Sequence, residues 1–176
     1  LLMVHILSAK DAHFMRAALA GDLAAAETAL KGGFLSRGAD VNCRDEFGNT
    51  ALMQVANNPA MMDLLARKGA DLKATNQFGQ TALHRAAHWN SRDAVVWLLD
   101  KGLDVNHRDG TGCTPFLEAV SNLEMLKLLA SRGADVKTAD QCGSTALHKA
   151  ALYGHADTIR WLVEQGLDVN VKNRTK

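Results

Sequence analysis

Apolar residues recur at helical spacing in short segments that are separated by turns containing glycine and aspartate. Residues 95–99 (Val-Val-Trp-Leu-Leu) and 159–163 (Ile-Arg-Trp-Leu-Val) are two such segments. Side chains three and four positions apart share one side of a helix, so each segment predicts a helix with a broad apolar stripe. Alanine pairs at 86–87 and 150–151 predict a second, thinner helical layer. Because one helix cannot bury so wide a stripe alone, we expect neighbouring segments to cover one another.

The turns themselves are periodic. A Gly-x-Asp turn occurs five times, and in the first four copies a threonine follows twelve residues after the glycine. The spacing between successive glycines alternates between 31 and 33 residues, which predicts a stack of similar units with one continuous core. The glycines are Gly38, Gly69, Gly102, Gly133 and Gly166, and the threonines are Thr50, Thr81, Thr114 and Thr145.

Both repeated residue types have a local physical role. A threonine hydroxyl caps a helix start by accepting hydrogen bonds from the unpaired amides of the first turn. A glycine at a helix end permits the left-handed backbone that a side chain would strain. We therefore expect a helix to begin after each threonine and a second helix to end at each glycine.

The segment from Thr81 to Asn106 contains Thr-Ala-Leu-His-Arg-Ala-Ala, Val-Val-Trp-Leu-Leu and Gly-Leu-Asp-Val-Asn. This pattern resembles the ankyrin repeat family, and the resemblance extends from Asp11 to about Asn170. It implies an all-α repeat solenoid of about five stacked ankyrin repeats, each a helix-turn-helix with a projecting hairpin finger. The implied organisation is an N-terminal segment 1–10, a capping repeat 11–44, repeats 45–76, 77–109 and 110–140, and a fifth repeat with a C-terminal tail over 141–176.

Several units depart from this pattern. The first has Ala12 where the threonine belongs, which is typical of an N-terminal cap, and Gly33 where the repeat glycine belongs. About five extra residues over 33–37 then predict a bulge. The second and fourth units lack two residues between their helices, which predicts a shorter inter-helix turn. No polar capping helix follows the fifth turn to cover Ile159 and Trp161, an edge that truncation or a partner would explain.

Composition and charge exclude some classes of function. The 176 residues include 20 basic and 19 acidic side chains, for a formal net charge of +1, so no overall positive field favours nucleic acid. No apolar run approaches the roughly 18 residues of a membrane span. We expect a cytoplasmic protein; if Leu1–Ala9 is the remainder of an export signal rather than a packing segment, the periplasm or secretion is the alternative.

Catalytic chemistry has no recognisable pattern. Cys43, Cys113 and Cys142 are odd in number and lack metal-site spacing, so we expect unpaired reduced thiols, including Cys113 and Cys142 on neighbouring fingers. The sequence shows no nucleophile beside a base and no glycine-rich phosphate loop, and the recurring aspartates are turn formers. We expect no enzyme, no cofactor and no metal.

The fingers are the first candidate binding surface, because their side chains have no core to fill. Phe47 and Phe78 occupy equivalent positions on adjacent fingers, where the family commonly has aspartate. Either both rings fold onto the hairpin base, or both are contact residues for a partner, each worth roughly 2 kcal/mol or more. The other finger candidates are Arg44, Glu46, Gln77, Arg108 and Thr111.

The ends of the first helices are the second candidate surface. Trp89 and Tyr153 lie at matching places in the third and fifth units and face the concave groove that the family resemblance implies. No core stripe includes them, and large amphipathic rings are common in binding surfaces, so we expect a partner-binding role. His88 and Leu152 flank them.

Other aromatic and histidine side chains are expected to be structural. Trp97 and Trp161 stand five residues before a repeat glycine, where the even units have leucine, and should lie in the core. His84 and His148 fall within the Thr-Ala-Leu-His signature. The family resemblance implies that they hydrogen-bond loop backbone between units rather than bind metal.

These observations predict a non-catalytic module that binds a partner protein through its fingertips and concave helical face. A rigid, preformed surface loses little entropy on association. The alternative is an inhibitor or immunity-type protein that occludes the active site of an enzyme. In both cases we expect a monomer when no partner is bound.

Overall fold

The computed structural model describes residues 7–32 and 37–174, and within these residues the chain forms ten α-helices in five antiparallel pairs. The first helices of the pairs are α1 (Ala9–Leu19), α3 (Ala51–Gln54), α5 (Ala82–His88), α7 (Pro115–Glu118) and α9 (Ala146–Leu152). The second helices are α2 (Leu23–Lys31), α4 (Pro59–Arg67), α6 (Arg92–Asp100), α8 (Leu123–Ser131) and α10 (Ala156–Glu164).

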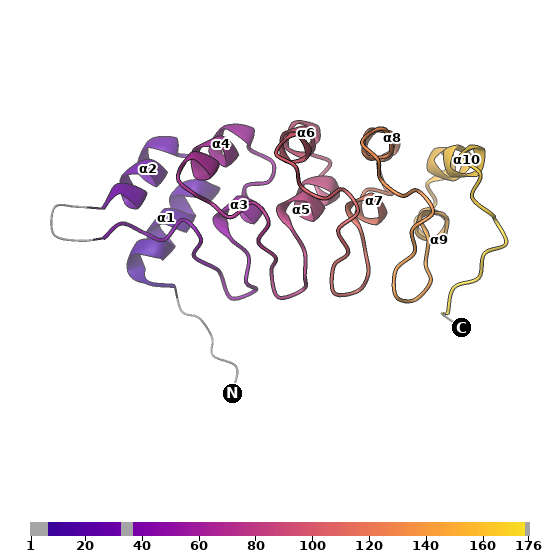
Figure 1. The fold of residues 1–176 in the computed structure, drawn as a ribbon, viewed down its shortest axis with the longest axis horizontal. Coiled ribbons are helices and arrows are strands. Elements are labelled where there is room, and N and C mark those ends of the chain that lie inside the picture. Colours follow the sequence, from indigo (N-terminus) through magenta and orange to yellow (C-terminus); the bar gives the residue numbers. More distant parts are fainter. Residues whose placement is uncertain (1–6, 33–36, 175–176) are drawn as a thin grey trace.

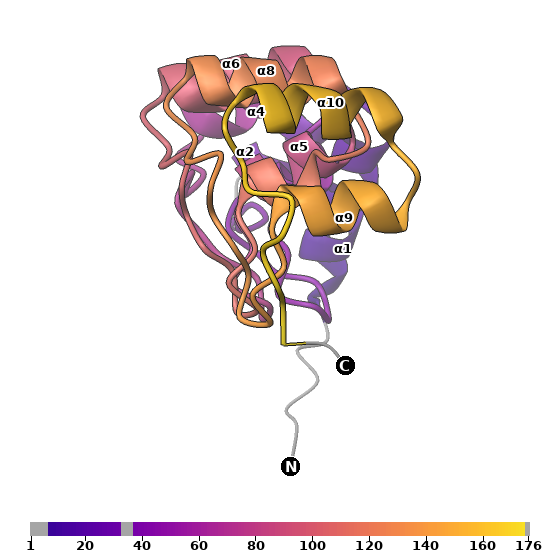
Figure 2. The ribbon, with the colours of Figure 1, turned by 90° about the vertical axis from the view of Figure 1, so that its right-hand side faces the viewer.

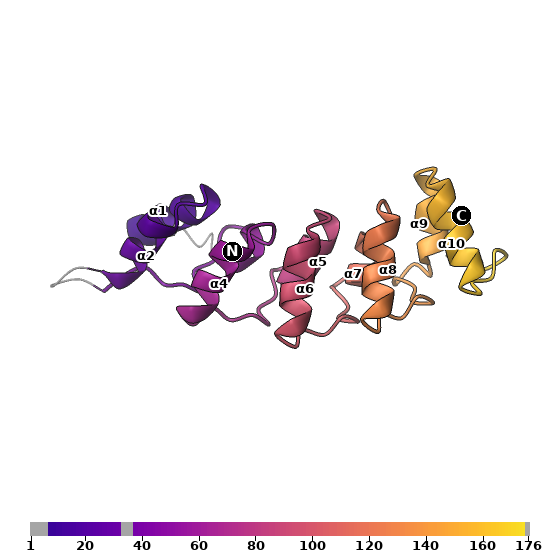
Figure 3. The same ribbon diagram turned by 90° about the horizontal axis from the view of Figure 1, so that it is seen from above.

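The pairs stack along one axis in chain order, which confirms the predicted all-α repeat solenoid (Figure 1). Second helices form one layer, in which α4, α6 and α8 lie side by side (Figure 3), and first helices form the other. The hairpin loops between pairs project from one end of the helices, opposite the α9–α10 connection (Figure 2). The first helix begins at Ala9, two residues before the predicted unit boundary, because Ser8 caps it by accepting a 3.1 Å hydrogen bond from the Asp11 amide.

The predicted capping threonines begin the first helices of units two to five. Thr50 and Thr114 each accept a 3.4 Å hydrogen bond from the amide three residues later. In the third and fifth units a histidine at the third helical position adds to the cap: the Thr81 amide donates to His84 Nδ1 at 3.2 Å. The repeat glycines from Gly69 onward are left-handed, as Gly133 with a φ of +90° shows.

The second helix of the first unit ends differently from the second helices of the later units. Here the left-handed residue is Gly32, with a φ of +67°, whereas the predicted Gly33 lies outside the described residues. The Ala39 amide donates to the Ala29 carbonyl at 2.9 Å, ten residues back, whereas the Ala70 amide donates to Leu65, five residues back. The flanking hydrogen bonds therefore match the predicted insertion of five residues.

The prediction of a shorter turn in the second and fourth units needs correction. The helices α3 and α7 contain four residues each, whereas α5 and α9 contain seven. The residues absent from the even units correspond to His88 and Trp89 in the third and to Leu152 and Tyr153 in the fifth. Because each second helix must still begin at its own cap residue, the first helix ends early and loses about a turn.

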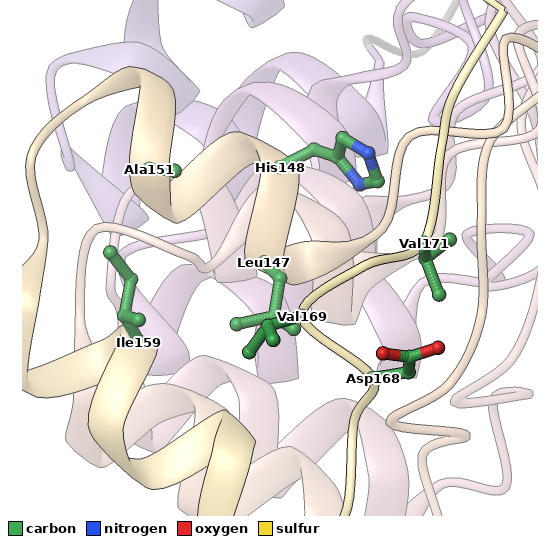
Figure 4. A pocket seen from close by; sticks show the side chains of 7 residues that line it. All are labelled: Leu147, His148, Ala151, Ile159, Asp168, Val169 and Val171. Atoms are coloured by element: carbon green, nitrogen blue, oxygen red, sulfur yellow. The ribbon is translucent and has the colours of Figure 1, made fainter.

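The core runs between units and thins at the C-terminal end. Phe14, Leu52, Leu83 and Phe116 occupy equivalent positions and are fully buried. The fifth equivalent, Leu147, is half-buried and lines an open pocket of about 250 Å³ with Ile159 and Val169 (Figure 4). Among the described residues no further helix pair covers Leu147, which fits the unprotected edge expected from the sequence. In the described ranges, no helix is both long and apolar enough to cross a bilayer.

Candidate functional site

Each finger is closed by a side chain that satisfies its own turn. Asp45 Oδ1 accepts hydrogen bonds from the Phe47 and Asn49 amides at 2.9 and 2.8 Å. Asn76, Asp109 and Asp140 make the same pair of bonds in the following fingers. The oxygen satisfies backbone amides that the tight turn leaves unpaired, so each fingertip is held in one conformation.

Neighbouring fingers are joined through their backbones. The Gln77 amide donates to the Phe47 carbonyl at 3.1 Å, and the Gly110 amide donates to the Phe78 carbonyl at 2.8 Å. The same bond links Gln141 to Thr111 and Arg174 to Cys142. The fingers therefore lie side by side as one ribbon (Figure 1) and present their tips with a fixed spacing.

Phe47 and Phe78 lie on adjacent fingers of this ribbon. Their exposed fractions are 48% and 53%, so about half of each ring remains in water. No ring pair between them is formed within the described residues. Half-exposed rings are compatible with shielding of the hairpin base and with contact to a partner, so both alternatives stay predictions.

The predicted arginines of the fingers are used inside the array. Arg44 Nη1 donates to the Gly48 carbonyl at 2.9 Å and to the Thr75 carbonyl of the next finger at 2.6 Å. Arg108 likewise donates to Thr138 Oγ1 at 2.9 Å and to the Ala139 carbonyl. Both side chains link neighbouring fingers while staying exposed, so the structure gives them a structural role that the sequence did not indicate.

The remaining finger candidates lie at the tips. Glu46 and Gln77 are exposed, and Gln77 is joined to the preceding finger only through its backbone amide. Thr111 is exposed, but its hydroxyl donates to Asp109 Oδ1 at 2.8 Å and so belongs to the turn. The tips therefore offer apolar rings and an acid beside a largely satisfied backbone.

A row of polar side chains lies on the first helices, on the side that faces the fingers. They stand four residues after the repeat position that threonine occupies in units two to five. Two contact the finger of their own unit: Gln54 Nε2 donates to Asp45 Oδ2 at 2.6 Å, and Lys149 Nζ lies 3.7 Å from Asp140 Oδ2. We call this set the inner row: Arg16, Gln54, Arg85, Glu118 and Lys149.

The inner row changes in charge from unit to unit, and its pairing depends on the finger beside it. The third finger has Asn76 where the second and fifth have aspartate, so the ion pair between Lys149 and Asp140 has no counterpart at Arg85. Arg85 Nε is buried and has no hydrogen-bond partner among the described residues. Glu118 contacts His88 Nδ1 at 3.2 Å.

The predicted surface at the ends of the first helices is present, with one correction. Trp89 packs partly against the core, contrary to the expectation that no core stripe includes it, and the Arg85 guanidinium carbon lies 4.5 Å from its ring centroid. Tyr153 and Leu152 are exposed to 66% and 76%, and His88 is exposed beside Glu118. These aromatic residues belong to two separate units rather than to one continuous patch.

The residues expected to be structural differ in their burial. His84 is buried, and its Nε2 lies 3.2 Å from the Cys113 carbonyl of the next unit, which confirms the predicted link between units. His148 repeats the cap contact to Thr145. Trp97 and Trp161 pack against the core but are only partly buried, at its boundary rather than inside it.

Reactive groups are dispersed. Burial raises the pKa of the Cys43 and Cys113 thiols to about 12, so both stay protonated, while Cys142 is exposed. All three cysteines are free. Across residues 7–32 and 37–174, no three His, Cys, Asp or Glu side chains are grouped closely enough to hold a metal ion.

Sequence reasoning missed the inner row. Its signal was the residue four positions after the threonine position of each repeat, which changes in charge between units while the two positions that follow it stay apolar. These residues are Arg16, Gln54, Arg85, Glu118 and Lys149. A position whose charge changes between otherwise similar repeats does not have to fill the hydrophobic core. It is therefore a candidate for recognition.

Comparison with known proteins agrees with this architecture. A family model described as ankyrin repeats (3 copies) matches residues 14–109 and 104–173. B-cell lymphoma 3 protein homolog from Mus musculus is 38% identical over 93 residues, which cover 51% of this chain and 21% of that protein. Transient receptor potential cation channel subfamily A member 1 from Homo sapiens is 30% identical over 183 residues, which cover 76% of this chain and 16% of that protein.

A third relative, SH3 and multiple ankyrin repeat domains protein 1 from Homo sapiens, is 38% identical over 86 residues, which cover 47% of this chain and 4% of that protein. The chain thus spans about a fifth or less of the length of these relatives. Ankyrin repeats are generally protein interaction modules, and the family is typically non-catalytic. On its periodic helix pairs, its capped fingers and these matches, the chain belongs to the ankyrin repeat family.

Proposed function

We propose that this chain binds a partner protein through its fingertips and the concave face formed with the first helices, acting as a rigid adaptor. The observation that carries the proposal is the pair of half-exposed rings, Phe47 and Phe78, on fingers whose backbones are already hydrogen-bonded to one another. Large aromatic rings that are exposed to water on an ordered surface are unfavourable in free energy, and a partner that covers the rings removes this penalty. Because the fingers are ordered beforehand, binding them loses little further entropy.

The test is capture of partners from an extract of the source cells with the wild-type chain and the Phe47→Ala/Phe78→Ala variant. We expect a partner that the wild type retains and the variant loses, with a Kd at least about 10-fold weaker for the purified pair. The matched control is Leu23→Ala/Val163→Ala, which removes apolar side chains of 42% and 41% exposure from second helices. Equal retention by all three proteins would contradict a role for the fingers.

The inhibitor hypothesis predicts one further result. If the captured partner is an enzyme, its turnover should fall when the chain is added and recover with the phenylalanine variant. No contact among the described residues favours inhibition over scaffolding. Unchanged turnover leaves the adaptor as the function.

We further propose that the chain is cytoplasmic, monomeric without its partner and not a binder of nucleic acid. Three free thiols suit a reducing compartment. On the fingers, the positive charges of Arg44 and Arg108 are offset by acidic side chains of the same fingers, so no basic stripe forms for a phosphate backbone; these acids are Asp45, Glu46 and Asp109. Salt-sensitive retention on immobilised DNA would contradict the last point.

A further inference from the structure

The shortened second unit leaves a depression between two longer neighbours. Helix α3 ends at Gln54, whereas α1 and α5 continue to Leu19 and His88. The space above its end measures about 590 Å³ and is lined by Leu19, Gly21, Gln54, Asn57, Asn58 and Trp89, among others. We call this space the notch. It is several times larger than the roughly 150 Å³ that encloses a benzene ring.

The exposed lining of the notch is mostly polar, but its two side walls each carry a large apolar side chain, and these come from different units. Leu19 is 57% exposed on the α1 side, and Trp89 stands on the α5 side, held between the core and the Arg85 guanidinium. The floor contains amide groups, of which Asn58 is occupied in capping Met61. An apolar side chain that enters the notch would cover both walls and lose little by displacing water from them.

Positive charge beside the notch lacks a partner. Arg85 has no ion pair within the part of the chain that the structure describes, and neither has Arg16, its equivalent on α1. Three acids along the inner row and its fingers already have partners: Asp45 contacts Gln54, Glu118 contacts His88 and Asp140 contacts Lys149. The guanidinium beside Trp89 therefore favours a carboxylate supplied from outside.

We propose that the notch binds an acidic peptide segment of the partner, which inserts an apolar side chain between Leu19 and Trp89 and pairs its carboxylates with Arg85 and Arg16. The inference rests on the proposed function as a protein-binding module and names the chemistry of the segment recognised. A phosphate polymer fits less well, because it has no apolar side chain to cover Leu19 and Trp89.

The test uses a phage-displayed library of random dodecapeptides panned on the whole chain. We expect enrichment of sequences in which Asp or Glu flanks Leu, Met or Phe, and we expect synthetic versions to bind at least about 10-fold more weakly to Trp89→Ala and to Arg85→Gln. The matched control is Arg160→Gln, which removes an exposed cation paired with Asp157 on α10. Thermal unfolding of each variant checks that it is folded.

A third variant tests the geometry without removing a contact residue. Two alanines inserted between Ala56 and Asn57 restore the 33-residue spacing, so α3 should lengthen and fill the notch. We expect this variant to remain folded and to lose the enriched peptides by at least about 10-fold.

The outcomes separate this inference from the proposed function. Peptides that depend on Phe47 and Phe78 but bind equally to the Trp89, Arg85 and insertion variants would overturn the notch and leave the fingers as the binding surface. Failure to enrich acidic peptides would also overturn it, as would tight binding of a single-stranded oligonucleotide that the same variants lose. Capture of a protein partner through the fingers is measured separately and does not depend on these results.

Discussion

His84 lies buried in α5, and its imidazole ring contacts both the cap of its own helix and the backbone of the next unit. Its Nδ1 accepts from the Thr81 amide, which places the ring proton on Nε2, where it faces the Cys113 carbonyl of the next unit at 3.2 Å. The neutral ring satisfies both contacts at once. Burial lowers the pKa of His84, because the charged form would lose its hydration.

The lowered pKa sets the sign of a pH dependence. An unfolded chain protonates His84 near pH 6.5, whereas the folded chain takes up that proton only at a lower pH. The free energy of unfolding should therefore fall as the pH drops below about 6.5, down to the folded pKa. Urea unfolding at pH 7.5, 6.5 and 5.5 measures this change, above the range in which Glu27 and Asp109, whose pKa values are lowered, begin to protonate.

The control is His84→Gln, which keeps a side-chain donor and removes the titration. We expect it to be about 1–2 kcal/mol less stable at pH 7.5, because two buried hydrogen bonds are weakened. Its free energy of unfolding should also vary less between pH 7.5 and 5.5. An unchanged pH dependence in this variant would show that other groups cause the effect.

At the scale of elements, glycines of the same backbone conformation differ in what surrounds them. Gly133 ends a second helix with a φ of +90°, and an added Cβ there would meet nothing within 4 Å. Gly79 ends a fingertip with a φ of +76°, and its Cβ would lie 2.8 Å from the Gly110 backbone nitrogen. That nitrogen donates the hydrogen bond to the Phe78 carbonyl that joins two fingers.

Alanine substitution should separate these two roles. Gly133→Ala should lower the free energy of unfolding by about 1 kcal/mol, because only the left-handed backbone conformation is strained. Gly79→Ala should cost at least about 2 kcal/mol, because the neighbouring finger must also move and its hydrogen bond weakens. Urea unfolding of both variants measures the difference. Equal losses would indicate that the fingers are not tightly joined.

For the whole molecule, stability depends on how many neighbours a unit has. The third unit is covered on both sides, so Leu83 and Val95 are fully buried, whereas Leu147 in the fifth unit is half-buried and Val163 is 41% exposed. In a linear stack each unit gains most of its burial from adjacent units. The fifth helix pair should therefore open more readily than the third.

Hydrogen exchange of this 176-residue polypeptide tests the gradient. Amides of α9 and α10 should exchange at least about 10-fold faster than those of α5 and α6, because local opening exposes less apolar surface at the edge. Mass spectrometry of peptides from the two pairs, which have matching helix lengths, gives the comparison. Uniform protection across the five pairs would contradict a nearest-neighbour stack.

The sequence by itself determined the repeating architecture. Capping threonines, left-handed glycines and the apolar stripe act over a few residues, so the sequence alone reveals them. The number of times that they recur predicts the number of stacked units. The repeat period also predicted the insertion near residue 33, and the resemblance to the family implied the histidine link from His84. What they did not predict is that α3 and α7 would shorten, since the loss of two residues is compatible with either a shorter turn or a shorter helix.

Only the tertiary structure decided which side chains are engaged and which are free. Arg44 and Arg108 join neighbouring fingers, whereas Arg85 has no counterpart of the ion pair between Lys149 and Asp140, because the finger beside it has Asn76. Trp89 borders a notch because the preceding unit is short. These outcomes depend on residues that lie in separate loops and helices and come into contact only when the units stack. Charge pairing and exposure are therefore set by tertiary contacts rather than by the local sequence.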